Sequence, residues 1–145
     1  MTATLHLPAR YPSPAVAELR AYLGEVAGRL GIGRESRAVD QGSPVSAYLG
    51  LADALPGYPD RDAALLWDEA HGWSVAVETH SGEDLIVLRY LGGRTVAPSP
   101  ARVAEFVTAV RNDDHRVGQL EPPAIRSAGS QLELEVLLRA RTGGR

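Results

Sequence analysis

Two stretches with strand character, joined by a short turn, decide the fold: WSVAVETH at positions 73–80 and LIVLRYL at positions 85–91. The first alternates apolar and polar side chains, which is typical of a strand with one face on a core. The intervening SGED permits only an antiparallel hairpin, because a parallel crossover needs a dozen or more residues. Positions 45–51 and 63–68 also have strand patterns, so we predict an antiparallel meander of about four strands over 45–91.

Helical patterns lie on both sides of the meander. Apolar residues recur at intervals of three and four over positions 14–30 and 100–111, and each run begins with a Ser-Pro pair that suits a helix start. A last segment, 130–141, alternates like a strand over its first half. Ser130 and Glu133 nevertheless form a capping box, and arginines follow the acids, so we favour a helix there.

These elements predict an α+β fold: a four-stranded antiparallel meander flanked by an N-terminal and a C-terminal helix, with an extra helix at the C-terminus. A chain of 145 residues fits one domain. We expect a tail at 1–12, a single α+β domain at 13–112, a linker at 113–129, and the C-terminal helix and tail at 130–145.

Charge and hydropathy exclude several classes of partner. The 15 basic and 18 acidic side chains give a net charge of −3, which argues against binding nucleic acid through a basic field. No apolar run is long enough to span a membrane, and the first ten residues do not form a secretion signal. We expect a cytoplasmic protein with no nucleic-acid or membrane partner.

The chain contains neither cysteine nor lysine, since all 15 basic residues are arginine. This excludes thiolate nucleophiles, cysteine-held metals, Schiff-base lysines and the phosphate-binding loop that needs lysine. We expect no cofactor. Arginine, alanine, glycine and proline have GC-rich codons, so a high-GC genome explains the arginines without a functional reason.

Three short motifs have structural explanations. The helicase-like DEAH at 68–71 lies in a hairpin turn, where acids and glycine are common, and no phosphate loop precedes it. The sequence GWSVA at 72–76 approaches a hydrolase nucleophile elbow, but a strand and not a helix follows the serine. The glycines at 28–33 follow a helix, which suits a C-cap better than a dinucleotide loop. We therefore assign no catalytic residue.

The histidines do not predict a metal site. His71 and His80 lie at opposite ends of one strand, roughly 30 Å apart at about 3.3 Å per residue. His80 has Glu78, Glu83 and Asp84 nearby, which could hold a hard cation weakly. A polar hairpin end produces the same residues for solubility, so we predict no metal ligand.

The central hairpin also predicts two sheet faces. A turn centred on Ser81-Gly82 aligns Glu78 with Leu85, Ala76 with Val87 and Ser74 with Arg89. One face is then core, made of Trp73, Val75, Val77, Ile86, Leu88 and Tyr90. The other is half apolar and brings Glu78 near Arg89. Such a face is usually covered, here by the second helix, by the C-terminal helix through Leu134, Leu137 and Leu138, or by another chain. The candidate binding residues are Ala76, Glu78, Leu85, Val87, Arg89, Leu134 and Leu138.

Several segments of the middle of the chain carry a resemblance: AYLGL at 47–51, PGYPDRD at 56–62, LLWDEAHGW at 65–73, VET at 77–79 and YLGG at 90–93, with Pro98 and the helix at 102–110. The chain resembles the actinomycete domain-of-unknown-function family "six-two-nine-two" over roughly residues 15–112. This resemblance implies one α+β domain and implies no activity, substrate or catalytic residue. The helix–meander–helix order is also similar to the secretion-chaperone-like fold, whose members bind other proteins, often as dimers.

We therefore expect a non-catalytic protein-binding or regulatory module that acts as a homodimer, with a protein partner or a second copy on the half-apolar sheet face. The alternative is a small-molecule-binding or enzymatic domain that uses His80, Glu78, Asp84 and Arg89 at the hairpin end. A flat apolar patch on the sheet would favour the first function, and a deep pocket with convergent polar groups would favour the second.

Overall fold

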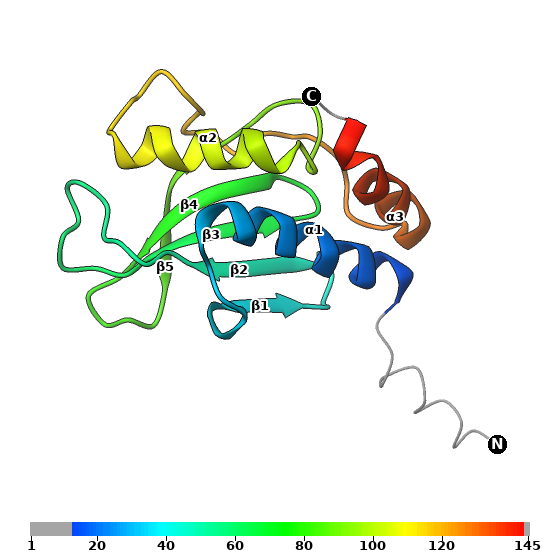
Figure 1. Ribbon diagram of the computed structural model, residues 1–145, viewed down its shortest axis with the longest axis horizontal. Coiled ribbons are helices and arrows are strands. Elements are labelled where there is room, and N and C mark those ends of the chain that lie inside the picture. The colour runs from blue at the N-terminus through cyan, green and yellow to red at the C-terminus, as the bar shows by residue number, and fades with distance from the viewer. Residues whose placement is uncertain (1–12, 144–145) are drawn as a thin grey trace, which may run out of the picture.

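The computed structural model describes residues 13–143 and has the predicted α+β fold. One five-stranded antiparallel sheet follows chain order, and Figure 1 shows α1 crossing in front of its middle with α2 beside it. The strands are β1 (Arg37–Asp40), β2 (Ser46–Gly50), β3 (Ala63–Asp68), β4 (Gly72–Glu78) and β5 (Leu85–Tyr90). Four strands form the predicted meander, and β1 is an edge strand that the sequence analysis missed. The predicted tail at 1–12 lies outside the described residues.

Two helices form where the sequence predicts them, α1 (Pro14–Leu30) and α2 (Pro100–Arg111). The Ser13 hydroxyl accepts a hydrogen bond from the third residue of α1 at 3.2 Å, and Ser99 does the same for α2 at 3.2 Å. Gly31 ends α1 in the left-handed conformation, with φ of 72°, which glycine adopts without a Cβ penalty. Short 3₁₀ helices, η2 (Arg34–Ser36) and η3 (Ala140–Gly143), follow α1 and α3.

The core lies between the sheet and the α1–α2 layer. Both tryptophans are buried there, Trp67 and Trp73, with valines and leucines from α1 and α2 around them. Their indole N–H groups are satisfied: Trp67 donates to the Val96 carbonyl at 2.7 Å, and Trp73 donates to the Tyr22 hydroxyl at 2.9 Å. Because a buried polar group without a partner is costly, these bonds fix the position of the loop before α2.

The last helix, α3 (Gln131–Arg139), confirms the helical reading of that segment, and Ser130 caps it by accepting from Glu133 N at 3.2 Å. The expectation that it covers the second sheet face is wrong. It packs beside α1 (Figure 1), and Leu134 and Leu138 are fully buried in the core. Arg141 pairs with Glu18 and Glu25 of α1 and holds the end of this helix in place.

The register of β5 departs from the prediction at one point. Glu78 pairs with Leu85 and Ala76 with Val87, as predicted, but an irregularity between Val75 and Ala76 shifts the remaining pairs. Ser74 therefore lies opposite Tyr90, and Arg89 lies opposite Val75. The shift moves Tyr90 off the predicted core face and moves Arg89 onto the helix side. Ile86, also assigned to the core, is 45% exposed.

The segment after α2 runs beside β5. Tyr90 and Gln119 exchange backbone hydrogen bonds at 2.8 Å in each direction. Further on, Arg126 pairs with the buried Glu69 at 3.0 Å, and the other Glu69 oxygen accepts from Val45 N at 2.8 Å. Glu69, in the DEAH motif, is thus a structural residue that joins the β3–β4 turn to two distant loops.

Candidate functional site

The sheet face away from the helices is the main candidate surface. Position for position, the register brings Tyr48, Leu66, Ser74 and Tyr90 into one row across β2 to β5. The neighbouring row contains Ala64, Ala76 and Val87, of which the two alanines are fully shielded by their surroundings. We call this surface the open face. Its side chains are Ala38, Asp40, Ser46, Tyr48, Ala64, Leu66, Asp68, Ser74, Ala76, Glu78, Leu85, Val87 and Tyr90.

The open face is hollow and contains exposed aliphatic residues. Leu85 is 39% exposed and Val87 is 37% exposed, and both line a hollow of about 390 Å³ together with Tyr48, Leu66 and Tyr90. No helix covers this side within residues 13–143, since α1 and α2 share a core with the opposite face and α3 packs on α1. An uncovered half-apolar face of this kind is typical of an interaction site.

Carboxylates lie at both ends of the open face. Asp40 and Asp68 belong to the row at one end, and Glu78 and Asp62 are adjacent at the other, where Glu78 N donates to the Asp62 carbonyl at 2.9 Å. The described strands contain two arginines, Arg37 and Arg89, and both register positions are on the helix side. The open face is therefore apolar in the middle and has carboxylates at both ends, where His71 Nδ1 lies 3.1 Å from Asp68 and Arg61 shares a hollow with Asp62 and Glu78.

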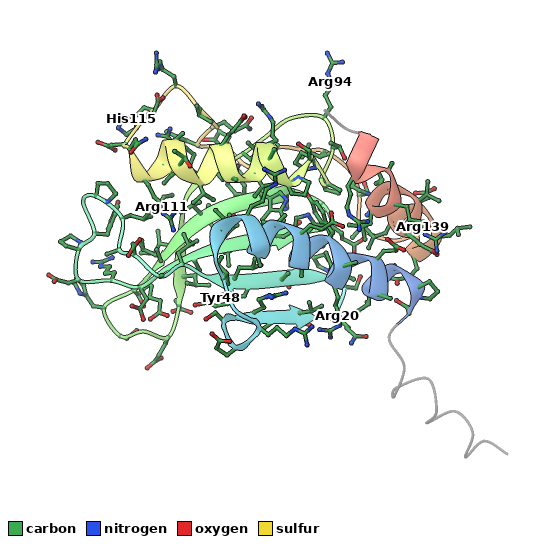
Figure 2. The ribbon with its side chains drawn as sticks, viewed as in Figure 1. Arg20, Tyr48, Arg94, Arg111, His115 and Arg139 are labelled. Carbon is green, nitrogen blue, oxygen red and sulfur yellow. The ribbon has the colours of Figure 1, made fainter. Side chains whose placement is uncertain are left out.

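Tyr48, which is labelled in Figure 2, is affected by the negative charge of two of these carboxylates. Partial burial raises the pKa of its phenol above the usual value, and the charges of Glu78 and Asp62 raise it further. The same three residues would meet any partner seated on this part of the sheet. A negative charge brought to this end would be repelled, and a positive charge would be attracted.

The structure separates the residues that the sequence analysis grouped as binding candidates. Ala76, Glu78, Leu85 and Val87 belong to the open face. Leu134 and Leu138 are core residues, and Arg89 lies on the helix side, where it donates to the carbonyls of Asp114 and Val117 at 3.0 and 2.9 Å. The predicted approach of Glu78 and Arg89 is thus wrong, because the bulge turns the arginine away.

Several open-face residues were not among the predicted binding residues, and the larger ones are Tyr48, Leu66 and Tyr90. The alternation within 45–51 and 63–68 could have placed Tyr48 and Leu66, since each lies between residues of the core face. Tyr90 could not have been placed, because its face depends on the bulge.

The alternative polar site at the β4–β5 hairpin is small. His80 Nε2 lies 2.7 Å from an Arg61 guanidinium nitrogen, and a hollow of about 200 Å³ is lined by these two residues with Glu78, Asp60 and Asp62. Arg89 is not part of it, and Asp84 contributes its carbonyl to Thr79 N at 2.9 Å. Within residues 13–143, no group of three or more His, Asp or Glu side chains is placed to hold a metal ion.

A larger cavity, about 530 Å³, lies between β5, the loop at 55–58 and the loop after α2. Arg89 is in its wall, but its guanidinium is already used, with His115 Nδ1 at 2.6 Å in addition to the two carbonyls. This arginine fixes the loop at 114–117 and leaves little unsatisfied polarity for a ligand.

Comparison with known proteins gives a match, and it falls on the part of the chain that contains the sheet. A family model described as "Family of unknown function (DUF6292)" matches residues 22–109. The chain belongs to this family. The match begins within α1 and ends within α2, so it includes the whole sheet and the open face. Searches of curated proteins and of solved structures returned no match.

No helix in the described part of the chain has both the length and the apolar character needed to cross a membrane.

Proposed function

We propose that this member of the family is a non-catalytic binding module that docks a protein partner on the open face. The observation that carries the proposal is the apolar hollow on this face, where Leu85 and Val87 of the edge strand β5 are each more than a third exposed. Removing apolar surface of this kind from water is favourable by about 25 cal/mol per Å².

The acidic ends of the face select the partner. A second copy docked through the same surface would bring carboxylates against carboxylates, because a two-fold interface pairs a surface with itself. Like charges placed together across an interface are unfavourable. The charge pattern therefore supports a different partner, one with an apolar stripe flanked by arginine or lysine, over the homodimer that the sequence analysis expected.

The spacing of the carboxylates sets the size of that partner. Asp62, which precedes β3, and Asp68, which ends it, are six positions apart, which corresponds to roughly 20 Å at about 3.3 Å per residue. A helix covers the same distance in about 13 residues. An amphipathic helix with leucines along one side and basic residues at both ends fits this face.

The test uses a fluorescent synthetic helix of this design, with arginines about 13 positions apart, and a control peptide in which glutamates replace the arginines. Fluorescence anisotropy at low salt should show binding of the arginine peptide and much weaker binding of the glutamate peptide. The V87E variant should bind the arginine peptide at least about tenfold more weakly than the unchanged protein does, since a charge is then buried in the contact.

V136E is the matched control, because Val136 is 61% exposed on the outer side of α3, away from the open face. It should bind like the unchanged protein. Equal losses in V87E and V136E, or equal binding of both peptides, would refute docking on the open face. A dimer in size-exclusion chromatography that V87E converts to a monomer would instead identify a second copy as the occupant.

A further inference from the structure

A second surface, on the other side of β1, concentrates positive charge. Arg20 from α1, Arg34 from η2 and Arg37 from β1 line one groove of about 480 Å³ between the helix and the edge strand. Arg20 lies on the lower side of α1, toward β1, in Figure 2. Three separate elements thus bring their cations to one place in a chain whose net charge is −3.

Like most of the described arginines, these three form no ion pair with a carboxylate, and they are distinguished by lining one groove together. Arg116, Arg126, Arg139 and Arg141 each form an ion pair with a carboxylate. None of the three groove arginines has an ion pair among the described side chains. The nearest acid in sequence, Glu35, places its carboxylate against the backbone of Gly33.

The groove is open because α1 has small residues there. Ala21 and Gly24 line it one helical turn apart, and a Cβ on Gly24 would meet a guanidinium nitrogen of Arg37 at 3.6 Å. Arg37 is held in position by a 3.3 Å hydrogen bond from its Nε to the Gly33 carbonyl. Glycine inside a helix costs about 1 kcal/mol relative to alanine, so this position maintains space at the expense of helix stability.

We infer that this groove binds a small phosphorylated organic molecule. The arginine fork matches the oxygens of a phosphate in geometry and charge. The exposed Ala21 and the half-buried Val39 supply an apolar wall for the organic part, and a cavity of this size lies within the range of about 300–1,000 Å³ typical of small-molecule sites. The groove lies at the β1 edge of the sheet, where Ala38 and Val39 line both it and the hollow of the open face, and its three arginines are not part of the open face.

Calorimetric titration with three probes tests it: inorganic pyrophosphate, adenosine 5′-diphosphate and citrate. We expect adenosine 5′-diphosphate to bind more tightly than pyrophosphate, because its organic part reaches the apolar wall. Citrate should bind most weakly of the three. R20Q and R34Q, both at exposed positions, should each weaken pyrophosphate binding about tenfold, whereas R102Q, an exposed arginine on α2, should leave it unchanged.

G24L separates a shaped site from general attraction of anions. The substitution keeps every charge, favours the helix and fills the groove. Adenosine 5′-diphosphate binding should fall in this variant while its free energy of unfolding is maintained or raised. The inference is overturned if no probe binds, or if citrate binds as tightly as pyrophosphate. It is also overturned if R102Q weakens binding as much as R34Q, or if G24L binds adenosine 5′-diphosphate as tightly as the unchanged protein does.

Discussion

At the scale of single residues, a short hydrogen-bonded chain inside the core connects α1, β4 and the loop before α2. Trp73 Nε1 donates to the Tyr22 hydroxyl at 2.9 Å, and that hydroxyl donates to the Pro98 carbonyl at 2.6 Å. Burial raises the pKa of the Tyr22 phenol far above its usual value, so the hydroxyl stays protonated and available as a donor.

Removing this hydroxyl should destabilise the fold. Tyr22→Phe leaves the Trp73 N–H and the Pro98 carbonyl without partners in the core, at a cost of about 1–3 kcal/mol in the free energy of unfolding. Urea denaturation followed by tryptophan fluorescence measures this difference. Tyr58→Phe, at a half-buried position with no hydroxyl hydrogen bond among the described residues, should change stability by less than about 0.5 kcal/mol. Equal stability of the two variants would contradict the account of this chain.

At the scale of elements, α3 is held against α1 by a pH-dependent contact. The hydrogen bond from Arg141 lowers the pKa of Glu25 below its usual value. Because the folded-state pKa is the lower one, this contact stabilises the fold fully above the ordinary glutamate value of about 4.3 and is lost as the pH falls through the folded value.

The difference in unfolding free energy between the unchanged protein and Glu25→Gln should therefore be largest near neutral pH and shrink as the pH falls below about 4.3. Chemical denaturation at a series of pH values measures it. Glu105→Gln, at an exposed position on α2, should give a difference that does not vary in this way. A difference for Glu25→Gln that stays constant or grows on acidification would show that Arg141 does not depend on this carboxylate.

The elements themselves were largely readable from the sequence, for local reasons. The positions of α1 and α2 followed from a Ser-Pro pair at each helix start and from apolar residues at helical spacing. The short connections between the strands required antiparallel pairing. β1 was missed because RAVD is short, contains two charges and lies among glycines. The position of α3 was not readable, since its leucines suit a sheet face as well as a neighbouring helix.

The candidate site was readable only in part. Alternation placed Ala76, Leu85 and Val87 on one face, but the bulge next to Val75 has no local signature and moved Arg89 and Tyr90. The groove was not found, because its arginines come from three elements and the codon argument gave each of them a neutral explanation. Faces follow from periodicity, whereas a cluster built across elements requires the tertiary fold.

At the scale of the whole molecule, the two sides of the sheet carry different chemistry. The helices lie on one side and the open face lies on the other, and the basic groove is at the β1 edge, where Ala38 and Val39 line both it and the open-face hollow. The central claim is that the open face is uncovered and accepts a basic, apolar partner.

Methyl NMR spectra of the protein, recorded while the arginine-tipped helical peptide is added, test this claim most directly. We expect shifts in the methyl groups of Leu66, Leu85 and Val87, and none in Leu19 or Val107, which are buried in the core. Saturating shifts confined to the open face would support docking there. Shifts confined to the α1–β1 groove or the outer side of α3, or no shifts at peptide concentrations that saturate the anisotropy signal, would contradict it.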